Sequence, residues 1–284
     1  MDRVATLLVT CPDRKGIVAS LAQVLYGHGA NILDSDQHTD TVAGLFFQRI
    51  RFDLSSLTTD KVALENAIKE VSERFAMDWR IAYSNHVRKV AIFASKQEHC
   101  LYDLLIRHRA GELACEIGMV ISNHGDAESI ARHFRVPFYH LPVTAETKAD
   151  AEAQASELIE ANGIELIVLA RYMQILSADF VAQYPSRIIN IHHSFLPAFV
   201  GANPYKQAYV KGVKMIGATS HYVTAELDQG PIIEQQTIRC SHSDVVDDLV
   251  RKGRDLEKQV LAAAVRWHLE DRILVYAGKT VVFG

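Results

Sequence analysis

Five short apolar runs, separated by amphipathic segments, constrain the fold of this chain more than any other feature. The runs occupy residues 90–94, 112–121, 138–141, 165–170 and 188–191. Short continuous apolar runs that alternate with helical segments are typical of parallel strands buried on both faces of a sheet. The amphipathic segment 148–162 stops at Gly163, the residue type that helix C-termini favour. The pattern predicts an α/β domain with a doubly wound, mostly parallel sheet.

The first part of the chain has a different order of elements. Its periodicity predicts strand, helix, strand, strand, helix and strand at residues 4–11, 16–26, 31–38, 45–52, 60–75 and 78–83. This βαββαβ order is that of a ferredoxin-like domain, with four antiparallel strands and two helices on one face. Residues 84–86 show no periodicity and form the expected linker, so we predict two domains, 1–85 and 86–284. The second continues with elements at 214–222, 231–237 and 243–270.

The composition argues against several classes of function. The chain has 284 residues, of which 49% are hydrophobic and 23% charged, and its formal net charge is −4. This charge provides no attraction for nucleic acid or for an anionic membrane. No apolar run approaches the roughly 18 residues of a membrane helix, and the start of the chain leads into a strand rather than an apolar leader. We expect a cytoplasmic protein whose four scattered cysteines are reduced thiols.

Polar side chains gather where the last of the five apolar runs ends, in the sequence N-I-H-H-S-F-L-P at residues 190–197. Asn190 and His192 are two residues apart on an expected strand, so their side chains project from the same side, while His193 should point elsewhere. Ligands of open parallel sheets bind at this carboxyl edge. Asp228 lies in a turn-like stretch, E-L-D-Q-G-P-I-I, from which it can approach the same cleft.

An amide, an imidazole and a carboxylate together suit the attack on a carbonyl group. The amide of Asn190 can donate to a developing oxyanion, His192 can transfer a proton near neutral pH, and Asp228 can hold a water or an imidazolium. Ser194 lacks the G-x-S-x-G frame of a nucleophilic serine. The attacking group is therefore expected to be water or a substrate amine.

The motifs N-I-H-H-S-F-L-P, G-A-T-S-H-Y-V and E-L-D-Q-G-P-I-I together resemble the catalytic domain of folate-dependent formyltransferases and hydrolases, over residues 89–284. The resemblance implies that Asn190, His192 and Asp228 are catalytic and that His221 supports them. It also implies that no cofactor is needed beyond the folate substrate. The stretch L-A-R-Y-M-Q-I-L-S corresponds to the lining of the folate pocket, which assigns substrate binding to Met173, Gln174, Ile175 and Leu176. Family members often carry arginine where this chain has Gln174, so the grip on the glutamate tail is not assigned.

The first domain carries a second resemblance. Its sequence D-R-K-G-I-V, followed by G-A-N-I, resembles an ACT domain, over residues 4–84. ACT domains often bind amino acids between paired copies. The resemblance therefore implies that Asp13, Gly16 and Asn31 face an amino-acid effector and that the protein is a homo-oligomer.

The acceptor of the formyl group is indicated by the first strand–helix turn of the second domain. Transferases that act on glycinamide ribonucleotide resemble one another in a glycine-rich phosphate loop at this place, whereas this chain has no glycine from Val90 to Ala110. With N-I-H-H in place of the N-I-H-P common in transferases, the chain resembles the deformylase branch of the family. That branch hydrolyses 10-formyltetrahydrofolate to tetrahydrofolate and formate, which supplies purine synthesis and balances one-carbon pools.

Three alternatives remain open from the sequence. The same residues can serve formyl transfer to an amine acceptor, although the missing phosphate loop argues against a nucleotide. His192, His193 and His221 can instead form a metal site for hydrolysis. The chain can also be a non-catalytic amino-acid sensor that has kept a folate-binding domain.

Overall fold

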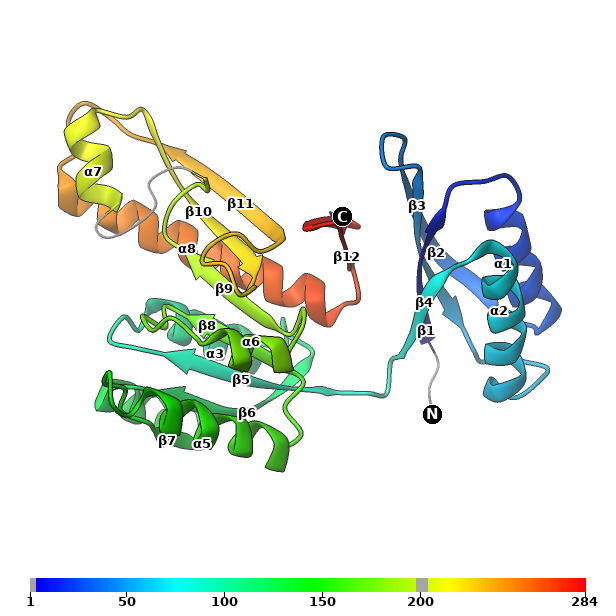
Figure 1. Ribbon diagram of the computed structural model, residues 1–284, viewed down its shortest axis with the longest axis horizontal. Coiled ribbons are helices and arrows are strands. Elements are labelled where there is room, and N and C mark those ends of the chain that lie inside the picture. Colours follow the sequence, from blue (N-terminus) through cyan, green and yellow to red (C-terminus); the bar gives the residue numbers. More distant parts are fainter. Residues whose placement is uncertain (1–3, 198–203) are drawn as a thin grey trace. The chain divides into compact units, whose positions relative to one another are not determined.

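The computed structural model describes residues 4–197 and 204–284. The chain divides into two compact units (Figure 1). The first extends to Val87 and also contains residues 271–276 and 281–284, while the second contains residues 88–270 and 277–280. Each unit has its own sheet and its own hydrophobic core.

The first unit is a four-stranded antiparallel sheet with two helices. Its elements are β1 (Val4–Pro12), α1 (Ile17–Gly27), β2 (Asn31–Asp40), β3 (Leu45–Asp53), α2 (Lys61–Phe75) and β4 (Asp78–Tyr83). The strand order is β2-β3-β1-β4. Asp60 begins α2, where its carboxylate accepts a hydrogen bond of 2.7 Å from the backbone N–H of Ala63.

Alternation along β1 separates the two faces of this sheet. Leu7 and Val9 point into a core with the apolar sides of α1 and α2, which cover one face (Figure 1). Leu8 points to the opposite face, where it packs with Phe47 and Phe283. The two short strands that supply this second cover are β12 (Ile273–Tyr276) and β13 (Lys279–Val282).

The second unit is built on a seven-stranded mixed sheet. Its strands are β5 (Arg88–Ala94), β6 (Cys115–Ser122), β7 (Phe138–His140), β8 (Leu166–Ala170), β9 (Ile188–His192), β10 (Met215–Tyr222) and β11 (Ile232–Arg239). They are arranged in the order β11-β10-β9-β8-β5-β6-β7. The five strands from β9 to β7 are mutually parallel, β10 is antiparallel to β9, and β11 is antiparallel to β10.

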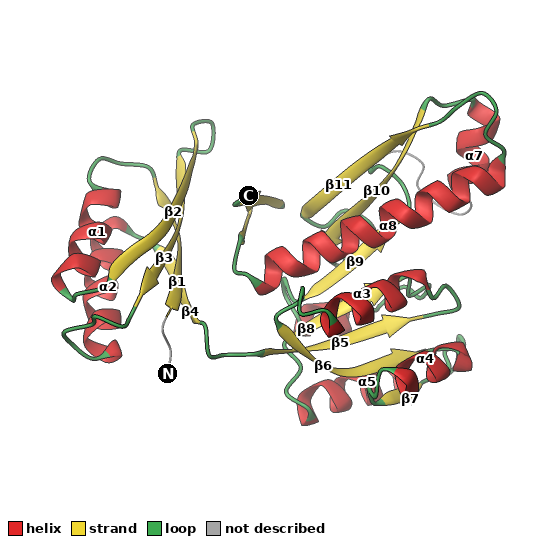
Figure 2. Ribbon diagram, turned by 180° about the vertical axis from the view of Figure 1, so that it is seen from behind, coloured by secondary structure: helices red, strands yellow, loops and turns green. Residues whose placement is uncertain are grey.

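Helices cover both faces of this sheet (Figure 2). They are α3 (His99–Arg109), α4 (Glu128–His133), α5 (Lys148–Ala161), α6 (Ala178–Gln183), α7 (Pro204–Lys211) and α8 (Val246–Leu269), with a short 3₁₀ turn at Gly125–Ala127. Helices α5 and α6 pack on one face, and α3 and α8 pack together on the other. β8 is buried along its whole length, which explains its uninterrupted apolar sequence. Within the described residues, none of the helices combines the length and the apolar character that crossing a membrane requires.

The predicted fold class is confirmed for both parts of the chain. One difference concerns the C-terminal residues, which the sequence assigned to the second domain. In the structure, Asp271 is buried in the first unit, where its carbonyl accepts a 2.9 Å hydrogen bond from Nε of Arg49 and its carboxylate pairs with Arg80. The apolar residues that follow it complete the core of that unit.

Candidate active site

The antiparallel pairing of β9 with β10 brings three of the expected site residues together. Asn190 and His192 project from the same side of β9, and the register places Asn190 opposite His221 of β10. Nδ2 of Asn190 lies 3.2 Å from Nε2 of His221. Residues paired across two strands share one face, so the sheet itself gathers these three side chains.

The hydrogen bonds of His221 define its protonation. Its Nδ1 lies 2.9 Å from the backbone carbonyl oxygen of Tyr222, which can only accept, so Nδ1 carries a proton. In the neutral ring Nε2 then accepts from the amide of Asn190. This assignment fixes the orientation of the Asn190 amide and leaves its second N–H for another acceptor.

The turn that follows β9 is held by a single threonine. Thr219 of β10 donates 2.9 Å to the carbonyl oxygen of Ser194 and accepts 3.1 Å from the N–H of Leu196. Thr219 is fully buried and lies opposite His192 in the register. The segment Ser-Phe-Leu after the histidines is therefore tied to the neighbouring strand directly beside His192.

Asp228 reaches the same point from the loop between β10 and β11. Its Oδ2 lies 3.2 Å from Nδ1 of His192, and its Oδ1 lies 3.7 Å from Nε2 of His221. The hydrogen bond from His192 holds the pKa of Asp228 well below its usual range, against the opposing effect of partial burial. The site therefore contains a carboxylate that stays ionised at neutral pH.

Backbone geometry in this loop explains the sequence L-D-Q-G. Asp228 has φ of 56°, a left-handed conformation that aspartate tolerates better than most residues. Two residues later, a Cβ on Gly230 would lie 1.6 Å from the carbonyl oxygen of Tyr222. Only glycine lets the loop approach the end of β10 this closely, and that approach brings Asp228 to His192.

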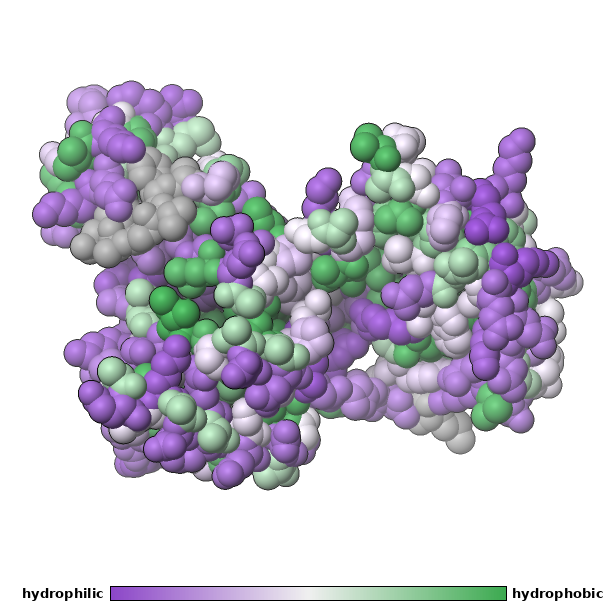
Figure 3. Space-filling model, viewed as in Figure 1, coloured by the Kyte–Doolittle hydropathy of each residue, from purple (hydrophilic) through white to green (hydrophobic). Residues whose placement is uncertain are grey.

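These side chains line a pocket of about 680 Å³ at the carboxyl edge of the parallel strands. Met173, Gln174, Ile175 and Leu176, which follow β8, form part of its wall together with the catalytic candidates. The backbone N–H of Met173 donates 2.9 Å to Oγ of the buried Ser95, which fixes the start of this segment. Apolar side chains gather where the surface of the second unit is hollowed (Figure 3). A largely apolar wall with few polar groups is typical of a small-molecule site.

The prediction that His193 points away from the site was wrong. β9 ends at His192, so strict alternation no longer applies one residue later. His193 lines the same pocket, and its ring stacks on that of His192 with centroids 5.2 Å apart and planes at 21°. Burial, together with the charge of Arg171, lowers the pKa of His193 to about 4, so its ring is neutral at physiological pH.

Sequence reasoning missed a group of buried polar residues beside the histidines. Glu257 of α8 is 1% exposed, and its carboxylate accepts 2.7 Å from Nε2 of His99 and 2.6 Å from the hydroxyl of Tyr205. Nε of Arg171 lies 3.4 Å from the same carboxylate. Burial opposes its ionisation, but the hydrogen bonds from His99 and Tyr205 and the charge of Arg171 outweigh burial and lower the pKa of Glu257. A glutamate on the buried stripe of α8, next to Leu256, was the signal in the sequence.

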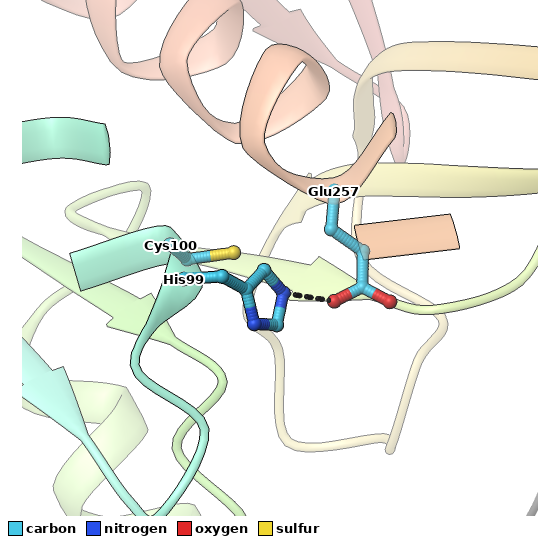
Figure 4. Close-up of side chains that lie close together, drawn as sticks. All are labelled: His99, Cys100 and Glu257. Atoms are coloured by element: carbon cyan, nitrogen blue, oxygen red, sulfur yellow. Dashed lines mark hydrogen bonds and ion pairs between the residues drawn. The ribbon is translucent and has the colours of Figure 1, made fainter. Parts of the chain in front are cut away.

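His99, Cys100 and Glu257 also form a cluster of metal-ligand types (Figure 4). Their ligand atoms lie within 4.8 Å of one another. The donor set does not suit a cation, because the guanidinium of Arg171 already lies against the carboxylate. Burial also raises the pKa of Cys100 well above its usual value, which keeps the sulfur a thiol rather than the thiolate that binds metals. In Figure 4 the imidazole points at Glu257, as a hydrogen-bonding partner does.

The three residues expected to bind an effector lie in the first unit. Gly16 precedes α1 with φ of 95°, so the unusual backbone expected there is present. Asp13 and Asn31 are exposed, and Asn31 is the first residue of β2, the edge strand of the sheet. Asp13 follows the end of β1, whereas Asn31 is level with Val4 at the beginning of β1, so a single chain does not bring these two side chains together.

Comparison with known proteins agrees with this architecture. Residues 5–75 match the ACT domain family, and residues 88–265 match the formyl transferase family. A formyltetrahydrofolate deformylase of Synechocystis sp. is 54% identical over 98% of both chains, and one of Bacillus subtilis is 50% identical over 98% of this chain and 93% of its own. The crystal structure of a deformylase from Pseudomonas syringae pv. tomato superposes with a TM-score of 0.96 at 48% identity, covering 100% of this chain and 95% of that one.

The fold and the site thus define a protein of the formyl transferase class that carries an ACT domain at its N-terminus. Near-complete coverage of both units by the relatives narrows the class further. The chain belongs to the formyltetrahydrofolate deformylase family.

Proposed function

We propose that the chain hydrolyses 10-formyltetrahydrofolate to tetrahydrofolate and formate, and so supplies formate for purine synthesis and balances one-carbon pools. The observation that carries this proposal is the convergence of Asn190, His192 and Asp228 in one pocket, next to the apolar segment that follows β8. The pocket volume of about 680 Å³ lies in the range of sites for ligands of this size.

The three side chains divide the chemistry between them. The free N–H of Asn190 donates to the formyl oxygen as it becomes an oxyanion. Nδ1 of His192 donates to Asp228, which leaves Nε2 as the base; Nε2 is buried and has no hydrogen-bond partner among the residues that the structure describes. Oδ1 of Asp228 holds the attacking water.

The proton balance follows from this division. The water oxygen bonds to the formyl carbon while its proton passes to Nε2 of His192, and the resulting imidazolium is stabilised by Asp228. Nε2 then gives the proton to N10 as the carbon–nitrogen bond breaks, and formate leaves. His221 supports the site by fixing the amide of Asn190.

The connection between β5 and α3 differs from the glycine-rich phosphate loop of the nucleotide transferases. Between β5 and α3 the chain has no glycine. Gln97 and His99 from this connection line the pocket instead, and they bond to Arg254 at 3.0 Å and to Glu257 at 2.7 Å. These contacts favour water as the acceptor over a nucleotide amine.

The folate is the only small molecule that the proposed chemistry needs, because base, oxyanion donor and water ligand all come from side chains. A metal shared by His192, His193 and His221 is not supported, since the metal-ligand cluster among the described residues lies elsewhere and is paired with arginine. Gln174 lines the pocket and contacts the substrate.

For the ACT domain we propose an amino-acid effector bound at Asp13, Gly16 and Asn31 in a cytoplasmic homo-oligomer. Because Asn31 and Asp13 lie at opposite ends of the sheet, the effector binds between two copies: Asn31 of one copy donates to its carboxylate and Asp13 of the other accepts from its ammonium group. The exposure of both side chains and the left-handed Gly16 support this assignment.

One experiment tests the proposed activity directly. Purified protein is incubated with 10-formyltetrahydrofolate alone, and formate and tetrahydrofolate are followed over time. Equal release of both products without an acceptor is expected. Turnover that requires glycinamide ribonucleotide or another amine would identify a transferase, and binding without turnover would identify a sensor.

A further inference from the structure

Glu257 is a buried anion that none of the proposed chemical steps uses. It lies on α8, and its two oxygens are both engaged: Oε1 by the hydroxyl of Tyr205, Oε2 by His99 and Arg171. Figure 4 shows the His99 ring directed at this carboxylate. A buried charge with this many partners is held in one position, since moving it would leave several polar groups unpaired.

Arg171 connects Glu257 to the histidine pair. Its Nη1 contacts Nδ1 of His193, and its Nε faces Glu257. A guanidinium only donates, so Nδ1 of His193 is the acceptor and the proton of the neutral ring is on Nε2. Arg171 itself has φ of 61°, a left-handed conformation that is costly for a residue with a long side chain. The surrounding contacts thus hold Arg171 in a backbone conformation that directs it at His193.

His193 in turn is the ring stacked on His192. The proposed reaction places a positive charge on His192 for part of each cycle. Asp228 from the β10–β11 loop contacts His192 directly, and His193 stacks on it; the charges of Arg171 after β8 and Glu257 from α8 act on His193. If Glu257 were removed, the cation of Arg171, which contacts His193, would lose the anion that balances its charge.

We propose that Glu257 is a positioning residue for hydrolysis. It orients Arg171 and neutralises its charge. Arg171 in turn keeps His193 an uncharged acceptor stacked on His192, so that His192 can accept a proton. The inference rests on the proposed function for its kinetic readout only. In this proposal the Arg171–Glu257 pair acts through its charges. A residue that only packs would not show an effect that depends on charge.

The test compares three variants with the natural chain: Glu257→Gln, Arg171→Gln and the double variant. Removing the anion disfavours a protonated His192 and so weakens the base; Glu257→Gln should lower kcat about 10-fold near pH 8 and shift the low-pH limb of kcat about one unit lower. KM should change less than about threefold, since Tyr205, His99 and Arg171 already occupy both carboxylate oxygens of Glu257. Removing the cation acts with the opposite sign, so Arg171→Gln should shift the limb higher. The double variant should return it to within about 0.3 unit of the natural position.

Asp255→Asn is the matched control. It removes one carboxylate from the same helix, but Asp255 is exposed and pairs only with Lys258 on the surface, at 2.8 Å. Its kcat and its pH limb should be unchanged. Shifts of the same sign in both single variants, an unshifted Glu257→Gln, or an equal shift in Asp255→Asn would overturn the proposal.

A measurement that does not need turnover keeps the two proposals apart. Histidine ¹⁵N NMR follows each ring across pH: His193 should remain in the Nε2–H tautomer from pH 5 to pH 8, and the ring bonded to Asp228 should titrate lower in Glu257→Gln. If these NMR results hold but the natural chain releases no formate, the network is right and the proposed activity is wrong. If formate is released but the NMR spectra are unchanged, the role of Glu257 is wrong. Should Glu257→Gln fail to fold, the Arg171→Gln shift and the double variant still decide the sign.

Discussion

Nδ1 of His192 lies 3.2 Å from Oδ2 of Asp228, although His192 ends a central strand and Asp228 belongs to a loop two strand connections later. This contact places the proton of the neutral ring on Nδ1 and so sets the tautomer that the proposed reaction needs. It is analogous to the orienting carboxylate of other imidazole bases.

The charge of Asp228 is expected to be needed for turnover but not for folate binding. Asp228→Asn keeps the shape of the side chain and tolerates the left-handed φ of 56°, so the loop should be preserved. We expect kcat to fall by about 10³ or more, because both water positioning and stabilisation of the imidazolium are lost. Formate release gives kcat, and quenching of protein fluorescence gives folate affinity. Normal turnover in this variant would remove Asp228 from the mechanism.

Gly230 should be essential for placing Asp228. In Gly230→Ala the new Cβ would meet the carbonyl oxygen of Tyr222 at 1.6 Å, so the backbone must move. We expect a loss of about 3 kcal/mol in the free energy of unfolding, together with most of the activity. Gly125→Ala is the control, since nothing lies within 4 Å of the added methyl group there. Urea denaturation and formate release measure both effects, and a loop that tolerates alanine at 230 would show neither.

The neutral His193 makes the fold sensitive to mild acid. Burial and Arg171 lower its pKa to about 4, below its value of about 6.5 in the unfolded chain. The unfolded chain therefore binds a proton first as pH falls, so stability should be lost progressively between pH 6.5 and pH 4, by at most about 3 kcal/mol.

A variant that cannot titrate isolates this contribution. His193→Asn keeps an acceptor for Arg171, and its free energy of unfolding should fall less than that of the natural chain over the same pH range. Exposed His242→Asn serves as the control. Identical pH slopes for the natural chain and His193→Asn would contradict the assignment of a neutral His193.

The proposed effector site predicts a ligand response that is separable from catalysis. We expect one amino acid to raise the melting temperature of the protein in a thermal-shift screen and to change the rate of formate release. Asn31→Ala should abolish that shift and leave basal kcat unchanged. Asn162→Ala, which removes an amide far along the sequence at the end of α5, provides the comparison. A shift that survives in Asn31→Ala would place the effector elsewhere.

Local patterns were sufficient for most of the fold because the two units use different periodicities. The strands of the first unit alternate, as Leu7 and Leu8 illustrate, whereas β8 and β9 are nearly continuous apolar runs. The C-terminal strands were missed, although Ala277-Gly278 between two apolar runs is a recognisable hairpin signal. Their assignment to the first unit depends on contacts with Leu8 and Phe47 that no local pattern encodes.

The candidate site was only partly visible in the sequence. Asn190, His192 and Asp228 stand at strand ends and turns, where polar residues attract attention. Glu257 lies on the buried stripe of a long helix and Arg171 follows a buried strand, and their pairing becomes apparent only when α8 is packed against the sheet. The residues that the sequence did not reveal, Glu257 and Arg171, are therefore those that come together only through the packing of distant elements.

Residues 271–276 and 281–284 belong to the first unit, so this unit cannot be excised as a single continuous segment without losing part of its core. Phe283, 5% exposed, shares a cluster with Leu8 and Phe47, and Leu274 and Tyr276 pack against it. A fragment excised at Val87 would leave this side of its sheet bare. Recombination that transplants only residues 1–87 onto another enzyme moves an incomplete module, so exchange of the ACT domain has to carry residues 271–284 with it.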